Sequence, residues 1–208
     1  MVVGWSWSPV RVTYGLGPWR REVLALEHLA LPPTGLWLIG GPPGAGKTTL
    51  LRWLWQRLEA GGAGARMVSE RFAFPPGARV GQVLGVNGAQ AWPQGLPRST
   101  ITEDQPVKTL SRGQRQLLGL AALDGTPAVP WLLDEPLAGL DAVQAVAVAR
   151  WLQQQAAARL IVAVSHALEP FTAAEATLLM LEAGGRAYEG LLAEWTPMVE
   201  PVASTVQA

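Results

Sequence analysis

The most informative part of this chain is Leu36-Trp37-Leu38-Ile39-Gly40-Gly41-Pro42-Pro43-Gly44-Ala45-Gly46-Lys47-Thr48-Thr49. It begins with a short apolar run that is typical of a buried strand, and it ends where leucines start to recur at helical spacing. Residues 41–48 fit the pattern G-x-x-x-x-G-K-[ST] at every fixed position, between strand and helix as the pattern requires. Glycines let backbone N–H groups approach phosphate oxygens, and the helix start adds a positive dipole end. The sequence therefore predicts a phosphate-binding loop.

The bulk composition favours one globular domain and excludes several classes of protein. The 208 residues are 49% hydrophobic and 15% charged, which argues against disorder. The formal net charge is +0, so no strong field attracts nucleic acid. Cysteine is absent, which excludes disulfides and thiolate metal sites. Residues 1–10 lack the features of a signal peptide and no apolar run approaches ~18 residues, so we expect a cytoplasmic chain.

Helical and strand patterns alternate along the chain, which predicts an α/β fold with a largely parallel sheet. Strands are expected at 36–39, 65–69, 129–133 and 160–164, helices at 48–58, 111–123 and 141–158, and a hairpin at 177–188. Residues 75–109 carry scattered Gly and Pro with one short helical candidate at 80–84, which indicates an inserted subdomain. We therefore expect a single domain over 1–195, with a helical subdomain at approximately 75–125, and a C-terminal tail over 196–208.

The apolar run that ends in Asp134-Glu135 is the second segment with chemical meaning. A carboxylate at the C-terminal end of such a strand lies beside the phosphate loop in an open α/β sheet. Lys47 would then reach the β- and γ-phosphates, and Thr48 and Asp134 would hold Mg²⁺. Glu135 would orient or deprotonate an attacking water. The alternative, a charged turn after a strand, is disfavoured by the phosphate loop upstream.

The segment Leu110-Ser111-Arg112-Gly113-Gln114 begins a predicted helix, and from spacing alone an ordinary N-cap at Ser111 is the favoured interpretation. The order of all these segments, however, resembles the ATP-binding cassette (ABC) ATPase family over roughly residues 10–192. Residues 110–114 match the family signature LSGGQ, with Arg112 in place of the first glycine. Asp141, at the end of residues 138–141, matches the D-loop, and Ser165-His166 match the switch histidine.

The resemblance implies a P-loop NTPase fold with a small antiparallel β region and a short helical subdomain. It implies ATP and Mg²⁺ as cofactors, and a homodimer that sandwiches two ATP molecules head to tail. Nucleotide contacts would come from Tyr14, Gly41, Pro42, Pro43, Gly44, Ala45, Gly46, Lys47, Thr48, Thr49, Glu70, Ser111, Gly113, Gln114 and Asp141. Lys47, Glu135 and His166 would be catalytic, and Thr48, Asp134 and Glu70 would face the metal.

Two of these assignments, Tyr14 and Glu70, have alternatives in the sequence. Tyr14 has a spacing to Lys47 that suits the aromatic ring that stacks on adenine, but Trp5, Trp7 and Trp19 are alternative platforms. Glu70 is the best match to the glutamine of the family's Q-loop, and the other reading is a solvated loop charge. Gln82 and Gln90 match that position less well.

The resemblance also implies partners. A second nucleotide-binding subunit and a separate transmembrane permease would place the chain on the inner face of the cell membrane. The short stretch between residues 70 and 110 resembles compact exporter ATPases, including the haem-exporter type of cytochrome c maturation. A soluble ABC ATPase acting on nucleic acid or ribosomes is the alternative, but no basic arm is present and no nucleic acid is expected. A regulatory module without turnover is disfavoured because Lys47, Glu135 and His166 are all present.

Overall fold

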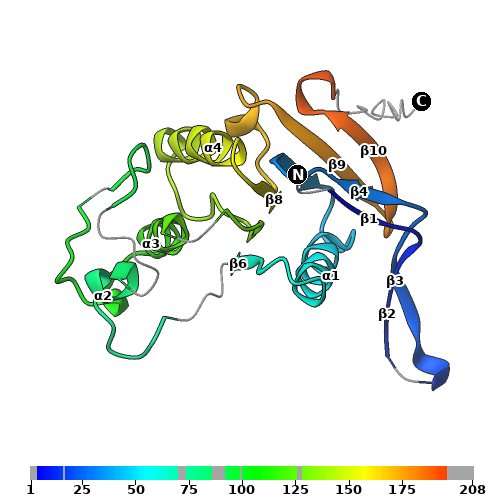
Figure 1. Cartoon of the computed structure of the whole chain (residues 1–208), viewed down its shortest axis with the longest axis horizontal. Helices are drawn as coiled ribbons and strands as arrows, with labels where there is room; N and C mark the ends of the chain where they lie inside the picture. Colours follow the sequence, from blue (N-terminus) through cyan, green and yellow to red (C-terminus); the bar gives the residue numbers. More distant parts are fainter. Residues whose placement is uncertain are drawn as a thin grey trace, which may run out of the picture.

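The computed structural model describes residues 4–15, 17–69, 74–85, 92–98, 100–125 and 128–195. Within these residues the molecule is built on a six-stranded sheet with the order β10-β9-β5-β8-β7-β6 (Figure 1). The strands are β5 (Gly35–Gly40), β6 (Arg66–Ser69), β7 (Trp131–Asp134), β8 (Leu160–Val164), β9 (Ala176–Glu182) and β10 (Gly185–Leu191). Only β10 runs antiparallel to its neighbour, which confirms the predicted α/β class and largely parallel sheet.

The described part of the chain has four α-helices. They are α1 (Lys47–Ala60), α2 (Val80–Gly85), α3 (Arg112–Asp124) and α4 (Ala142–Ala156). Of these, α1, α3 and α4 pack on the sheet and α2 packs on α3. Alternation along β5 separates the cores, because Leu38 packs in the cluster that holds α2, α3 and α4. Its neighbours Trp37 and Ile39 pack in the cluster that holds α1. Short 3₁₀ turns occur at Gly17–Trp19, Val107–Thr109, Glu169–Phe171 and Leu192–Glu194.

The small antiparallel β region lies at the N-terminal end. It comprises β1 (Trp5–Trp7), β2 (Val10–Tyr14), β3 (Arg21–Leu26) and β4 (Leu29–Leu31), where β1 pairs with β4 and β2 with β3. The β2–β3 hairpin projects away from the central sheet (Figure 1). None of the helices in the described ranges is both long and apolar enough to span a bilayer.

Two helices begin with the same capping arrangement. The Ser111 side chain accepts a hydrogen bond from the Gln114 N–H, and the Gln114 side chain accepts one from the Ser111 N–H, which confirms the predicted N-cap. Asp141 and Gln144 make the equivalent box at α4. Helix α4 therefore begins after Asp141, rather than at that residue.

The predicted strand 129–133 was wrong at its start, because β7 begins at Trp131. Pro130 has no N–H to donate to the neighbouring strands, although its carbonyl accepts from the Arg66 N–H at 2.8 Å. The strand ends at Asp134, which confirms the carboxylate predicted at its C-terminal end.

An aromatic stack supports β7 from the side of α4. The ring centroids of Trp131 and Trp151 lie 5.7 Å apart at 27°, and the Arg159 guanidinium lies 4.1 Å from the Trp131 ring centroid. Both tryptophans are fully buried, and Arg159 is buried beside them. Burial lowers the pKa of the Arg159 guanidinium, and the charge of Asp124 opposes that shift. Arginine stays protonated in this position and stacks favourably on the ring.

We expect Trp131→Ala to lower the free energy of unfolding by about 3–5 kcal/mol, because it leaves a large cavity at the centre of this stack. Urea unfolding measures the change. The matched control is Trp19→Ala, since Trp19 is 84% exposed, and it should change stability by no more than about 0.5 kcal/mol. Equal losses in the two variants would contradict a supporting role for the stack.

Candidate functional site

One row of residues across the sheet positions the site. Ile39 of β5 pairs with Val164 of β8, Val164 pairs with Asp134 of β7, and Asp134 pairs with Ser69 of β6. All these strands are parallel, so the segments that follow them emerge at the same edge. The residues expected to bind phosphate and activate water are therefore gathered from distant parts of the sequence.

The loop between β5 and α1 has the backbone geometry that its glycines permit. Gly41, Gly44 and Gly46 have φ values of 131°, 82° and 97°. A Cβ on Gly41 would lie 2.2 Å from the Leu181 carbonyl oxygen, so no other residue fits there. Gly46 is the N-cap of α1, and the Leu50 N–H donates to its carbonyl at 2.8 Å. The helix thus begins directly at the loop, as an anion site requires.

The Lys47 side chain turns back onto this loop. Its Nζ donates to the Gly41 carbonyl at 2.7 Å and to the Pro42 carbonyl at 2.9 Å, and the residue is buried. Burial lowers the pKa of the Lys47 ammonium, and the nearby carboxylates of Glu135 and Asp134 raise it. The ammonium therefore lies beside two acids, in the position where it can meet a bound phosphate.

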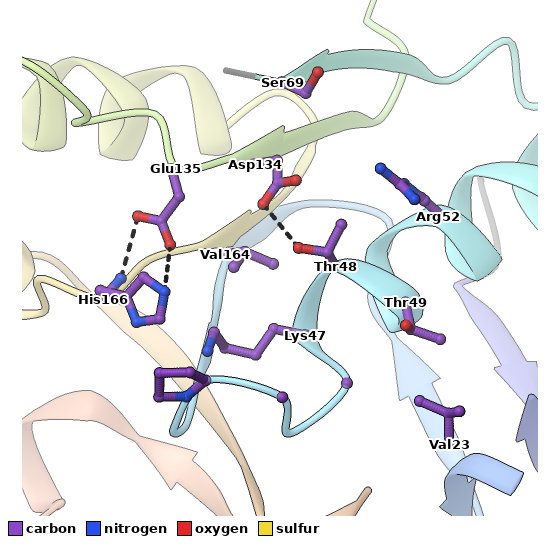
Figure 2. A pocket seen from close by; sticks show the side chains of 13 residues that line it. Val23, Lys47, Thr48, Thr49, Arg52, Ser69, Asp134, Glu135, Val164 and His166 are labelled. Atoms are coloured by element: carbon purple, nitrogen blue, oxygen red, sulfur yellow. Dashed lines mark hydrogen bonds and ion pairs between the residues drawn. The ribbon is translucent and has the colours of Figure 1, made fainter. Parts of the chain in front are cut away.

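Thr48 and Asp134 form the second part of the site. The Thr48 hydroxyl donates to Asp134 Oδ1 at 3.3 Å, between the first turn of α1 and the end of β7 (Figure 2). The described residues contain no cluster of three or more His, Cys, Asp or Glu side chains that could hold a metal by themselves. One hydroxyl and one carboxylate suit Mg²⁺, which keeps several waters and takes further oxygens from bound phosphates.

Glu135 and His166 face each other across the edge of the sheet (Figure 2). Glu135 Oε2 accepts from the His166 backbone N–H at 3.3 Å, and His166 Nε2 lies 3.3 Å from Glu135 Oε1. That second contact has the distance of an ion pair but does not meet hydrogen-bond geometry, so Oε1 is buried without a hydrogen-bond partner among the described residues. A buried carboxylate oxygen without a donor is suited to accept from a water or a ligand.

The Glu135 backbone is held in an unusual conformation. Its φ is 54°, in the left-handed region that non-glycine residues rarely adopt. The Glu135 N–H donates to the Val164 carbonyl at 2.9 Å, and its own carbonyl accepts from the Ala138 N–H at 3.1 Å. Such a conformation costs about 1–3 kcal/mol and persists where the surroundings enforce it, often at functional sites.

These elements surround an open cavity of about 630 Å³. Its lining consists of Val23, Pro43, Gly44, Gly46, Lys47, Thr48, Thr49, Arg52, Ser69, Asp134, Glu135, Val164 and His166. The structure thus brings together most of the predicted phosphate loop, both strand-end acids and the histidine.

Four lining residues were missed by the sequence analysis. Arg52 follows Thr48 by one helical turn, so helical spacing alone could have placed it on the same side. Ser69 and Val164 lie in the row that ends at the site, which only the strand register reveals. Val23 comes from β3, and no local pattern indicates that it reaches the cavity.

Other predicted residues lie outside the cavity lining. Gly41 and Pro42 contribute carbonyl groups to Lys47, and Ala45 is buried beneath the loop. The residues Ser111, Gly113, Gln114 and Asp141 lie at the starts of α3 and α4 and do not line it.

The residues predicted to form the adenine platform and the Q-loop do not line the cavity among the described residues. Tyr14 is 52% exposed on β2 and does not line the cavity. Trp7 packs edge-on against Trp53, with ring centroids 5.4 Å apart. Glu70 and Gln90 lie outside the described residues. The Gln82 side chain accepts from the Arg79 N–H at 2.9 Å.

The chain resembles known proteins in sequence. No model of a known protein family matches it. The cytochrome c biogenesis ATP-binding export protein CcmA 2 of Cupriavidus metallidurans is 32% identical over 141 residues, which cover 54% of this chain and 67% of the relative. The cytochrome c biogenesis export protein of Gluconobacter oxydans is 32% identical over 58% of this chain and 63% of its own length. The one from Zymomonas mobilis is 40% identical over 39% of this chain and 38% of its own. The matches thus span between 38% and 67% of these relatives' lengths.

Solved structures agree with this chain over most of its length. A dimeric ATP-binding cassette in a post-hydrolysis state, bound to ADP and Pi, superposes with a TM-score of 0.68 at 18% identity, over 89% of this chain and 97% of that one. A bacterial Atm1-family ABC exporter with ATP bound gives a TM-score of 0.70 at 21% identity, over 91% of this chain and 39% of that one. These likenesses establish the fold. Since the identity with the Cupriavidus protein extends over two thirds of that relative, we conclude that this chain belongs to the ATP-binding cassette family.

Proposed function

We propose that this chain binds and hydrolyses ATP with Mg²⁺, and that it powers export through a separate membrane-spanning subunit. The observation that carries the proposal is the Glu135–His166 pair, which faces the same cavity as the Lys47 loop. A buried cation, a phosphate loop and a carboxylate oxygen without a donor together suit attack of water on a terminal phosphate.

Each part of the cavity has a proposed role. The loop N–H groups and the Lys47 ammonium bind the β- and γ-phosphates, and Thr49 also lines the cavity. Thr48 and Asp134 hold Mg²⁺, which neutralises phosphate charge when it is bound. Glu135 orients the attacking water and accepts its proton, and His166 fixes the position of that carboxylate.

A second copy of the chain completes the site in this proposal. The signature residues Ser111, Gly113 and Gln114 lie outside their own cavity, which supports contact with a nucleotide bound by another subunit. The capping box fixes the Ser111 side chain and the start of α3, whose N-terminal dipole end attracts an anion. Asp141, fixed by its own box at the start of α4, lies on the segment between Glu135 and that helix.

For the adenine ring we propose Tyr14 as the stacking platform. It is exposed on the β2–β3 hairpin, and β3 of the same hairpin contributes Val23 to the cavity. Trp7 is engaged with Trp53, so it is a poorer platform than Tyr14. Trp19, at the exposed 3₁₀ turn of the hairpin, is an alternative aromatic side chain, whereas Trp5 packs against the core cluster that holds α1.

The proposed membrane role draws on the relatives. The Cupriavidus, Gluconobacter and Zymomonas proteins are all named as ATP-binding export proteins of cytochrome c biogenesis. We infer that this chain serves an exporter of the same type, as a homodimer at the cytoplasmic face of the membrane. Glu70, the proposed Q-loop residue, would contact Mg²⁺ and the partner from the segment after β6.

We expect Glu135→Gln to reduce steady ATP turnover by about a hundredfold or more, since the general base is lost. ATP binding should persist, because the amide keeps the size of the side chain and leaves Lys47 and Thr48 intact. Phosphate release and fluorescent-nucleotide titration measure the two effects. The control is Glu103→Gln, whose side chain is 60% exposed away from the cavity. Turnover that survives in Glu135→Gln would contradict the assigned base.

We expect Lys47→Gln to weaken ATP binding by about tenfold or more, because it removes a charge-assisted contact worth roughly 1.5–3 kcal/mol. The chain has one other lysine, Lys108, which is exposed and outside the cavity. Lys108→Gln should therefore bind ATP as the wild type does, and calorimetric titration compares the two. If both variants bind alike, Lys47 does not hold the phosphates.

A pull-down tests the membrane role. Tagged Glu135→Gln, with ATP and Mg²⁺, is incubated with detergent-solubilised native membranes, and bound proteins are identified by mass spectrometry. We expect recovery of a protein with several apolar spans of about 20 residues in roughly equal amount. The Lys47→Gln/Glu135→Gln double variant should lose the ATP dependence of this capture. Recovery of ribosomes or nucleic acid alone would replace the transport role with that of a soluble ATPase.

A further inference from the structure

The signature loop and the D-loop of one chain touch each other backbone to backbone. A Cβ added to Gly113 would lie 2.3 Å from the Gly139 carbonyl oxygen and 3.0 Å from its carbonyl carbon. Because these are backbone atoms, no rotamer change could relieve the clash. The start of α3 and the segment between β7 and α4 are therefore packed as closely as two backbones can be.

The contact is mutual, and Arg112 extends it. Gly139 has a φ of 77°, and a Cβ there would lie 3.1 Å from the Gly113 nitrogen. It would also lie 3.2 Å from Arg112 Cγ and 3.3 Å from Arg112 Cβ. The aliphatic stem of Arg112 thus lies across Gly139. A glycine at position 112 would have no such stem, so this part of the contact depends on the arginine.

Arg112 also lines a recess at the end of β6. The recess has a volume of about 140 Å³ and is also lined by Ser69, Arg115 and Gln116, among others. Ser69 also lines the nucleotide cavity, so the recess and the cavity share one wall. Arg112 therefore contacts the D-loop and also lines a recess to which the end of β6 contributes.

The D-loop is in turn tied to the proposed catalytic carboxylate. The Ala138 N–H donates to the Glu135 carbonyl at 3.1 Å, and the Leu140 N–H donates to the Leu137 carbonyl at 3.2 Å. Leu137 is 8% exposed and packs in the core, which fixes this turn. A displacement of Gly139 is consequently expected to displace Glu135 as well, through the turn that joins them.

We propose that Arg112 and Gly139 form a clasp that positions the signature loop relative to Glu135 of the same chain. Glu135 acts on the chain's own nucleotide, whereas Ser111 and Gly113 contact the nucleotide of the second copy, so the clasp couples the two ATP sites of the dimer. This role rests on the function proposed above. Both residues act by positioning, and neither contacts the reacting atoms.

The test uses two glycines with nearly the same φ but different surroundings. Gly139 and Gly62 have φ values of 77° and 74°, and a Cβ on Gly62 would meet nothing within 4 Å. Both Gly→Ala variants therefore place alanine at a similar positive φ, and only Gly139→Ala also pushes on the clasp. We expect Gly139→Ala to lower kcat about tenfold, since small displacements of catalytic groups are costly. KM and ATP binding by the separate chain should stay unchanged, and Gly62→Ala should turn over as the wild type does.

Arg112→Gly provides the second arm, because it removes the stem against which the methyl group added by Gly139→Ala would push. In the Arg112→Gly background, adding Gly139→Ala should lower kcat by a clearly smaller factor than in the wild type. Additive effects of the two substitutions, or equal effects of Gly139→Ala and Gly62→Ala, would overturn the clasp.

A readout without turnover separates this inference from the proposed function. The thermal midpoints of the same variants form a second cycle, in which Gly139→Ala should lower the midpoint more than Gly62→Ala does, and Arg112→Gly should shrink the difference. A wild type without ATP turnover would defeat the proposed function, while the midpoints would still test the contact. Coupled midpoints with uncoupled kcat values would leave the contact in place but overturn its role in positioning.

Discussion

The parallel pairing of β8 with both β5 and β7 is the constraint on which the rest of the structure depends. It places Ile39, Val164 and Asp134 in one row, so the phosphate loop, His166 and Glu135 all follow from the same edge. A shift of one residue in either pairing would turn alternate side chains to the opposite face and separate these groups. The apolar clusters on both sides of the sheet enforce this register, because a shifted strand would turn its apolar side chains away from the cluster in which they pack.

Local hydrogen bonds and backbone geometry fix the side chains of the site before any ligand binds. Lys47 is closed onto its own loop, Thr48 contacts Asp134, and Glu135 is held toward His166 by a left-handed backbone. Fixing these groups in advance lowers the reorganisation needed when a charged ligand enters. The capping boxes likewise fix the starts of α3 and α4, because their capping side chains already hydrogen-bond to backbone N–H groups.

The sequence predicted the elements whose signals are local. The strand and helix that flank residues 41–48, the cap at Ser111 and the buried strand at 160–164 each carry a complete pattern within a few residues, and the structure agrees with all three. The start of β7 was misplaced, since apolar character extends through Pro130 although its missing N–H does not suit the ladder. Cavity residues such as Val23 and Ser69 could not be found, because strand pairing and hairpin placement join residues far apart in the chain.

The core shared by α2, α3 and the sheet has a mechanical consequence. Val80 and Leu84 of α2 pack in the same cluster as Leu117 of α3 and Leu38 of the central strand β5. Closely packed interiors are nearly incompressible and transmit displacement instead of absorbing it. A load applied to α2 therefore reaches the sheet through the contacting side chains of this cluster. We expect the short helical region to move as a rigid unit, so that a small displacement of its outer surface also displaces the edge of the sheet.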